Sequence, residues 1–333
     1  MKAILRDRYG SPDVLGVADV DRPEPFGDEV LVRVEAASLN TADLDHLRGL
    51  PHLARLGTGL GRPRSPRTGL DVAGRVEAVG PDVTELRPGD EVWADLFAFG
   101  HGSFAEYVCA PERAFSPKPT GATFEEAAAV PHSGVLALQA LTARGPIQPG
   151  QEVVVNGAGG CVGPFAVQIA RSMGATVTGV DHGGKLDLVR KIGADHVVDY
   201  TRDDVTRSGR RYDLIVDIAA NRPPLRFLRA MTPRGRYVLI ARTLGGFARA
   251  AVLGGLVTLL TGRRMGVFAW VPNRHRDLDV LARLIDTGEV RPLLDRCYPL
   301  EEVPAAFERL AEGAARGKLV VIPDPTRTER EGE

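Results

Sequence analysis

The chain has 333 residues, of which 44% are apolar and 26% are charged, and its formal net charge is −1. These values are typical of a soluble globular protein of about two domains and exclude a fibrous or disordered chain. The charge balance also predicts that neither nucleic acid nor a membrane is a partner. Cys109, Cys161 and Cys297 are few and far apart, so we expect free thiols in a reducing cytoplasm.

The first part of the chain, to about residue 119, consists of short β-type runs separated by glycine and proline. The expected strands cover residues 3–5, 30–34, 72–79, 91–94 and 104–108. Residues 38–49 read as a loop that enters a short helix. Residues 56–68 read as a mobile surface loop, whose arginines are solvated charge rather than a phosphate clamp.

From residue 123 the pattern changes to alternating helices and strands. Residues 123–141 predict a helix, with Thr123 and Glu126 resembling a capped start. Further on, the sequence predicts helices at 185–192 and 225–231 and strands at 196–198, 212–217 and 236–240. This alternation is typical of a parallel, doubly wound α/β sheet.

The last part of the chain contains four further predicted elements. The apolar residues 250–260 are too few to span a bilayer, so we expect a buried or ligand-covering helix there. Helices at 278–286 and 304–312 and a strand at 319–322 follow. The charged residues 324–333 predict a disordered tail.

The strongest pattern is the glycine-rich turn between the strand at 153–155 and the helix that follows. Ala158, Gly160 and Gly163 occupy the three key places of an A-x-G-x-x-G pattern, and Asp181 ends the next strand. In such a turn, backbone amides approach a pyrophosphate at the N-terminus of the helix. The turn therefore predicts a dinucleotide site, which also includes Cys161 and Val162. Cys161 is either a small filler or an oxidation-sensitive thiol.

Several motifs together resemble the medium-chain dehydrogenase/reductase superfamily, in particular its zinc-free, quinone-oxidoreductase-like branch. The motifs are SLNTAD at 38–43, DVAGRVEAVG at 71–80, PGDEV at 88–92, FAEYV at 104–108, GADHVVDY at 193–200, YPL at 298–300 and GK at 317–318. The resemblance covers nearly the whole chain. It implies a GroES-like, β-rich substrate domain at 1–123 and 273–323, a Rossmann domain at 124–272, and a homodimer.

The resemblance also bears on chemistry. The zinc-dependent alcohol dehydrogenases of the same superfamily have zinc ligands at the positions of Asn40 and Leu70, and a proton-relaying hydroxyl at Ala42. Neither Asn nor Leu is an ordinary zinc ligand, so we expect no metal. The branch reduces a quinone, or the carbon–carbon double bond of an enone, with hydride from NADPH. The alternative is a cofactor-binding protein with little redox activity, similar to the lens crystallin of this branch.

Three side chains are candidate catalytic groups. Asn40 either donates a hydrogen bond to the acceptor oxygen or fixes its own loop. His132, at the place of another zinc cysteine in the alcohol dehydrogenases, is either a general acid or a structural histidine. Ser133 beside it adds a second polar group.

The choice of cofactor stays open in the sequence. A carboxylate such as Asp181 ordinarily binds both ribose hydroxyls and repels a 2′-phosphate, which favours NADH. In contrast, Lys185 and Tyr200 stand where NADPH-using quinone oxidoreductases carry phosphate-binding residues, and His182 is a further donor. We expect NADPH by a small margin, with NADH nearly as well supported.

Overall fold

The computed structural model describes residues 1–143, 145–240, 254–255, 257–267 and 270–324. The chain divides into two compact units: residues 1–135 with 272–333 form unit 1, and residues 136–271 form unit 2. The sequence pattern places these boundaries after residues 123 and 272. In the structure, residues 124–135 are therefore grouped with unit 1.

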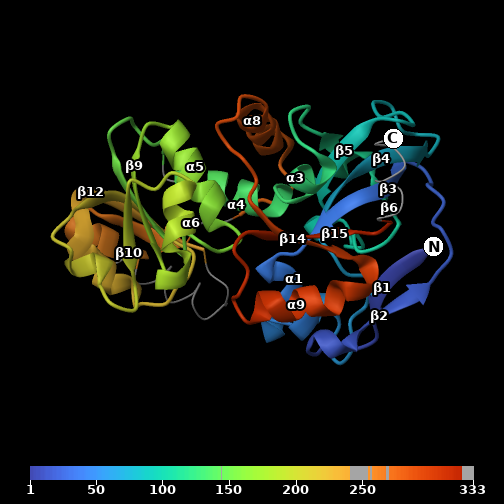
Figure 1. Ribbon diagram of the computed structural model, residues 1–333, viewed down its shortest axis with the longest axis horizontal. Helices are drawn as coiled ribbons and strands as arrows, with labels where there is room; N and C mark the ends of the chain where they lie inside the picture. The colour runs from blue at the N-terminus through green and yellow to red at the C-terminus, as the bar shows by residue number, and fades with distance from the viewer. Residues whose placement is uncertain (144, 241–253, 256, 268–269, 325–333) are drawn as a thin grey trace. The chain divides into compact units, whose positions relative to one another are not determined.

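Unit 1 is built on a mostly antiparallel sheet (Figure 1). Its strands follow in the order β14, β15, β3, β4, β5 and β7, and β6 also pairs with β3. Their bounds are β3 Glu29–Ser38, β4 Asp71–Val79, β5 Glu91–Asp95, β6 Tyr107–Pro111, β7 Ser116–Pro117, β14 Leu294–Pro299 and β15 Lys318–Ile322. A separate pair is formed by β1 Lys2–Arg6 and β2 Leu15–Asp19. Because β15 pairs with β3, the last strand of the chain lies beside one of the first.

The described helices of unit 1 differ in how their ends are capped. They are α1 Thr41–Arg48, α2 Arg55–Thr58, α3 Phe124–Ala128, α8 His275–Asp286 and α9 Val303–Ala311. The predicted capping box of α3 is confirmed, since Thr123 and Glu126 each accept a hydrogen bond from the other's backbone amide. The helix expected over 123–141 is divided, however. A second helix, α4 Pro131–Thr142, begins at a proline, which cannot continue the helix before it.

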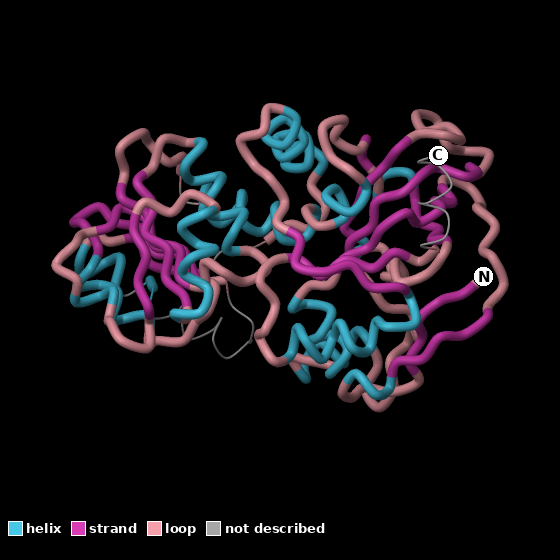
Figure 2. Tube along the Cα trace, in the orientation of Figure 1, coloured by secondary structure: helices cyan, strands magenta, loops and turns pink. Residues whose placement is uncertain are grey.

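Unit 2 contains the predicted doubly wound fold. Its described sheet has the order β10-β9-β8-β11-β12-β13, and every pairing in it is parallel. The bounds are β8 Glu152–Asn156, β9 Thr176–Asp181, β10 His196–Asp199, β11 Tyr212–Asp217, β12 Met231–Leu239 and β13 Arg264–Val267. The helices α5 Gly163–Ser172 and α6 Leu186–Lys191 pack against β9 (Figure 2). The expected combination of a GroES-like and a Rossmann-like unit is confirmed.

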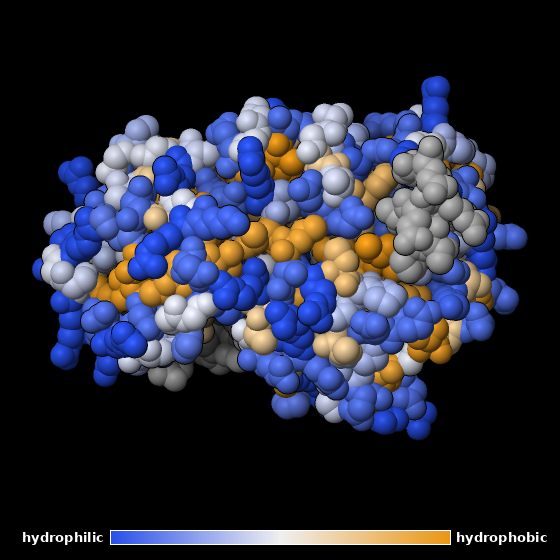
Figure 3. Space-filling model, in the orientation of Figure 1, coloured by the Kyte–Doolittle hydropathy of each residue, from blue (hydrophilic) through white to orange (hydrophobic). Residues whose placement is uncertain are grey.

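Several elements differ from their predictions. The strand expected at 104–108 begins only at Tyr107, and the helix expected at 225–231 is a 3-10 helix, Pro224–Ala230. In the region 250–260, residues 257–260 are helical, with Leu259 and Leu260 exposed rather than buried, and most of the remainder lies outside the described residues. The predicted tail also lies outside them, except for Asp324. The face in Figure 3 shows hydrophobic residues between many hydrophilic ones.

Candidate active site

The glycine-rich turn connects β8 to α5 in unit 2. Gly157 has φ +95°, a conformation that favours glycine, and its amide donates to the carbonyl of Val180 at 2.9 Å. A Cβ atom at Gly163 would lie 2.2 Å from the carbonyl oxygen of Gly157, so only glycine permits the helix to pack this closely on the turn. The nearest atom to a Cβ at Gly160 would be 3.6 Å away, which leaves space above the turn.

The turn also presents free donors. In the part of the chain that the structure describes, the amides of Cys161 and Val162 donate to no acceptor. They lie at the N-terminus of α5, where unpaired amides and the helix dipole favour an anion. These features fit the pyrophosphate of a dinucleotide.

Four side chains gather near the carboxyl end of β9. The Asp181 carboxylate accepts from the amide of Gly159 at 2.7 Å and from that of His182 at 2.8 Å. Lys185 Nζ lies 3.4 Å from the carbonyl oxygen of Gly159, and the His182 and Tyr200 rings contact edge to face, with centroids 6.2 Å apart. One carboxylate and three possible hydrogen-bond donors thus border the position that a ribose occupies in this type of fold.

A second group of polar residues lies inside unit 1. We call it the buried polar cluster, and it consists of Asn40, Asp43, Asp71, Asp95, His132, Ser133 and Lys318, each no more than 5% exposed. Such burial is unusual for charged residues and requires that they be paired. The cluster combines residues from β4, β5, α1 with its cap, the first turn of α4, and β15.

Lys318 is the central cation of the cluster. Its Nζ atom donates to Asn40 Oδ1 at 2.6 Å, to Asp71 Oδ2 at 3.3 Å and to Ser133 Oγ at 3.4 Å. These three partners match the three N–H bonds of an ammonium group. The cation is therefore satisfied although only 1% of the residue is exposed.

Asp71 is the main anion that faces this lysine. Besides Lys318, it accepts from Ser38 Oγ at 3.1 Å, from Asn40 Nδ2 at 2.8 Å and from the amide of His132 at 2.8 Å. Burial raises the pKa of Asp71, although Lys318 opposes this shift. Asn40 thus links the lysine to the aspartate, with its carbonyl toward one and its amide toward the other.

His132 forms a pair with Asp95. Its Nδ1 atom lies 3.0 Å from Asp95 Oδ2, while the other carboxylate oxygen accepts from the amide of Phe97 at 2.9 Å. The amide of Asp95 donates in turn to Asn273 Oδ1 at 3.1 Å. Burial lowers the pKa of His132, but the carboxylates of Asp95, Asp71 and Asp43 together outweigh this effect, and the net direction is upward. This pairing favours the protonated form of the imidazole over the neutral form.

Three aromatic rings extend from His132 toward the surface. The Phe97 ring, 41% exposed as a residue, has its centroid 6.1 Å from the rings of both His132 and His101. His101 stacks on His46 with centroids 4.3 Å apart. Burial lowers the pKa of His46 to about 3 and that of His101 to about 4, so both are neutral rings at pH 7. A group of neutral aromatic rings therefore adjoins the His132–Asp95 pair.

The structure brings together Asn40, His132 and Ser133, the three catalytic candidates from the sequence. It also places in the cluster residues that the sequence did not indicate. Lys318 and Asp71 belong to motifs that support the family resemblance, yet no role was assigned to them. The available signal was a charged residue at the start of a strand, followed by apolar residues, as in KLVVI of β15 and in the first three residues of DVAGRVEAV of β4. Asp95, at the end of β5, had a similar signal.

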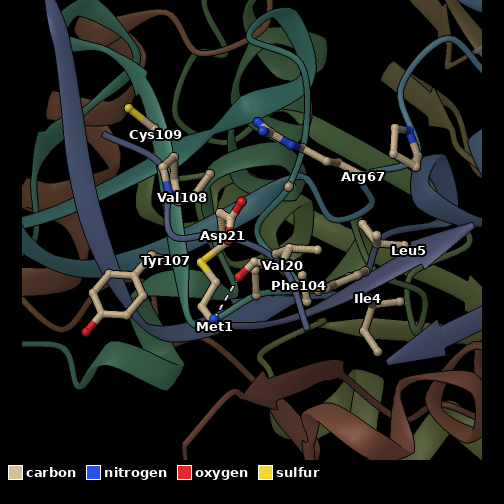
Figure 4. A pocket seen from close by; sticks show the side chains of 15 residues that line it. Met1, Ile4, Leu5, Val20, Asp21, Arg67, Phe104, Tyr107, Val108 and Cys109 are labelled. Carbon is tan, nitrogen blue, oxygen red and sulfur yellow. Dashed lines mark hydrogen bonds between the residues drawn. The ribbon is translucent and has the colours of Figure 1, made fainter. Parts of the chain in front are cut away.

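Other features of the described residues lie apart from this site. A pocket of about 240 Å³ in unit 1 is bordered by Met1, Val20, Tyr107 and further residues (Figure 4), and none of the buried polar cluster lines it. The three cysteines are free thiols. The part of the chain that the structure describes has no group of three or more His, Cys, Asp or Glu side chains arranged to hold a metal ion.

Comparisons with known proteins agree with this architecture. The model of the alcohol dehydrogenase GroES-like domain matches residues 27–120, and that of the zinc-binding dehydrogenase matches residues 192–321. The chain is 32% identical to the mitochondrial NAD(P)H oxidoreductase RTN4IP1 of Mus musculus, with 96% of this chain and 89% of the relative covered. It is 33% identical to the trans-enoyl reductase pgmF of Aspergillus terreus, with 90% and 87% covered.

A solved structure extends the likeness to the fold. The quinone oxidoreductase from Coxiella burnetii superposes with a TM-score of 0.84 at 28% identity, covering 97% of this chain and 99% of the other. The similarity thus spans both units of the chain. The chain is an oxidoreductase that belongs to the medium-chain dehydrogenase/reductase superfamily and is quinone oxidoreductase-like.

Proposed function

We propose that the protein reduces a quinone, or the carbon–carbon double bond of an enone, without zinc and with NADPH as the preferred cofactor. The observation that carries the proposal is the His132–Asp95 pair, in which a buried imidazole with a raised pKa lies beside neutral aromatic rings. A nicotinamide cofactor would be held by the amides of the glycine-rich turn. When bound, it supplies the hydride.

The proposed reaction transfers a hydride and then a proton to the acceptor. The acceptor gains two electrons and one proton with the hydride, and negative charge develops on its carbonyl oxygen. The imidazolium of His132 then gives up one proton, directly or through water, to the reduced acceptor, and solvent reprotonates the ring. Asp95 orients the ring and stabilises its charged form.

The buried polar cluster supports independence from zinc. Asn40 stands where the zinc branch carries a ligand, and its side chain is already held by Lys318, Ser133 and Asp71. A fixed ammonium group thus provides positive charge in this part of unit 1. The roles of Asn40 and Ser133 are then to position the lysine and the start of α4.

Turnover with a panel of quinones and enones tests the proposal, after NADPH binding has been shown by fluorescence titration. We expect oxidation of NADPH in step with loss of acceptor, and unchanged rates after dialysis against a strong chelator. Cofactor binding without turnover of any acceptor would contradict the reductase assignment. About one tightly bound zinc per chain would contradict the zinc-free part of it.

The cofactor, assembly and compartment complete the proposal. Lys185, Tyr200 and His182 outnumber Asp181 as groups that could face a 2′-phosphate, which supports NADPH. We retain a homodimer in a reducing cytoplasm as our expectation. Light scattering of the purified chain and fractionation of cells test these two points.

A further inference from the structure

One surface stretch of unit 1 has an unusual composition. Residues 46–70 contain no aspartate or glutamate but five arginines, so that their formal charge is +5 while that of the whole chain is −1. The arginines are Arg48, Arg55, Arg62, Arg64 and Arg67. Within the described ranges, none of them forms an ion pair with a carboxylate. We call this stretch the basic leucine segment.

The same segment exposes leucines. Leu50, Leu53, Leu56 and Leu60 are 37%, 60%, 61% and 71% exposed. In contrast, Leu47 and Leu70, at the two ends of the segment, are at most 1% exposed. Large apolar side chains that gather on a surface and are bordered by charges mark an interaction site.

The backbone of the basic leucine segment is fixed by polar contacts rather than by burial of these leucines. The Tyr9 hydroxyl lies 2.9 Å from both Thr58 Oγ1 and the carbonyl oxygen of Gly59. The Arg55 guanidinium lies over the Tyr9 ring, 4.5 Å from its centroid, and donates to the carbonyl of Gly49 at 2.9 Å. The segment is thus attached to unit 1 at its centre, while the four leucines from Leu50 to Leu60 are exposed to solvent.

We propose that the basic leucine segment binds the surface of a membrane rich in anionic lipids. The leucines would enter the boundary between headgroups and acyl chains, and the arginines would contact lipid phosphates, as in other interfacial segments. No helix in the described part of the chain is long and apolar enough to cross a bilayer, so this binding is peripheral. The absence of a membrane partner was predicted from the net charge of the whole chain, which conceals the local excess of arginine.

Charge and apolar exposure together favour a membrane over other partners. Nucleic acid would also attract the arginines, but four exposed leucines have no role on a phosphate backbone. A second copy of the chain would cover the leucines, yet it would bring five more arginines against the first five. Only an anionic, partly apolar surface matches both properties.

The test is flotation of the full-length protein with vesicles of phosphatidylcholine, with and without about one third phosphatidylglycerol. We expect the protein to float with the anionic vesicles and to remain behind with the neutral ones. The variant Arg62→Gln/Arg64→Gln should lower the partition coefficient about 30-fold, because each arginine near such a surface contributes about fivefold. We leave Arg67 unchanged because it also lines the pocket in Figure 4.

Two further variants complete the design. Leu53→Ser/Leu56→Ser should lower binding at least tenfold while leaving the charge unchanged. Arg210→Gln/Arg211→Gln removes the same charge from two exposed arginines of unit 2 and should change binding less than twofold. Circular dichroism and light scattering verify the fold and the oligomeric state of each variant.

Five results would overturn the proposal. The first is equal flotation of the wild-type protein with neutral and anionic vesicles. The second is an equal loss of binding in the unit 2 control. The third is a leucine variant that keeps full vesicle binding. The fourth is a leucine variant whose oligomeric state changes, which would assign the leucines to self-association. Binding to single-stranded RNA without binding to vesicles would also refute it.

Discussion

The glycine-rich turn of unit 2 and the buried polar cluster of unit 1 differ in the chemical groups from which they are built. The turn would bind a cofactor with backbone amides, and it needs small residues, such as Gly163, more than it needs any particular side chain. The cluster depends on side chains, among them Lys318 and Asp71, that are charged and almost fully buried. A site made of backbone amides tolerates the loss of one neighbouring charged side chain. In a buried network, the loss of one charged side chain leaves its partners buried without a compensating charge or hydrogen bond.

The largest effect should follow from Lys318→Met. This change leaves Asp71 buried without its cation and should reduce the free energy of unfolding by about 3 to 5 kcal/mol. Lys185→Ala, beside the turn, removes a lysine with one long contact to a backbone oxygen and should cost less than about 0.5 kcal/mol. Urea unfolding of both variants measures the contrast. Similar losses in the two would show that the regions do not differ in this way.

His132→Leu addresses catalysis in the cluster. It removes the proposed proton donor and should lower kcat by roughly 10- to 1000-fold with little change in NADPH affinity. The pKa of His132 is raised, so the wild-type rate should fall as pH rises above the ordinary histidine range, where the imidazolium loses its proton. Steady-state kinetics from pH 5 to 9 test this.

The matched control for this change is His196→Leu, at an exposed position of β10. It should leave both the rate and the pH profile unaltered. If His132→Leu itself kept the wild-type kcat and profile with several good acceptors, the imidazole would be a packing residue and solvent would be the donor.

Asp43→Asn should change how the free energy of unfolding depends on pH. Burial raises the pKa of Asp43 from 3.8 to about 7, although the amide of Asn40 donates to it. The folded chain therefore binds the carboxyl proton of Asp43 more tightly than the unfolded chain does. The stability that this proton contributes to the folded state declines as pH rises from about 4 to about 7. Asp43→Asn should remove a slope of at most about 1.4 kcal/mol per pH unit.

This slope is measured by denaturant unfolding at a series of pH values. The raised pKa of His132 contributes in the same direction, since its stabilisation is lost as pH rises through the folded pKa, so some slope should remain. Asp203→Asn, at an exposed site of unit 2, should keep the full slope. A steeper decline in Asp43→Asn than in the wild type would contradict the account.

The smallest effect is expected at the turn. Asp181→Ser removes a carboxylate that repels a 2′-phosphate and should raise the preference for NADPH over NADH about tenfold. Lys185→Ala should lower the same ratio. Dissociation constants for the two cofactors provide the measurement. A wild-type protein that binds NADH ten times more tightly than NADPH would assign control of the site to Asp181.

The two regions also differ in how far sequence reveals them. The turn occupies consecutive residues, so its glycines, its flanking strand and its helix could all be predicted. The cluster joins residues as far apart as Asn40 and Lys318, which are brought together only when β15 pairs with β3. Its central lysine could not be inferred from spacing because no local pattern links these positions.

Local boundaries failed for smaller physical reasons. Pro131 divides the helix predicted over 123–141, although the apolar spacing continues across the break. A 3-10 helix, Pro224–Ala230, stands where an α-helix was expected, and Pro223 and Pro224 restrict the backbone at its start. In both places a backbone restriction outweighed side-chain periodicity.

The position of Lys318 near the end of the chain has a consequence for protein synthesis. Unit 2 is one continuous segment, so it can fold on the ribosome before translation ends, whereas unit 1 awaits residues beyond 271. Until β15 emerges, Asp71 and Asn40 lack their ammonium partner, and the end of β3 at Ala37 and Ser38 lacks the strand that later pairs with it. The nascent first segment therefore passes through a period in which a chaperone that covers sheet edges would protect it from aggregation.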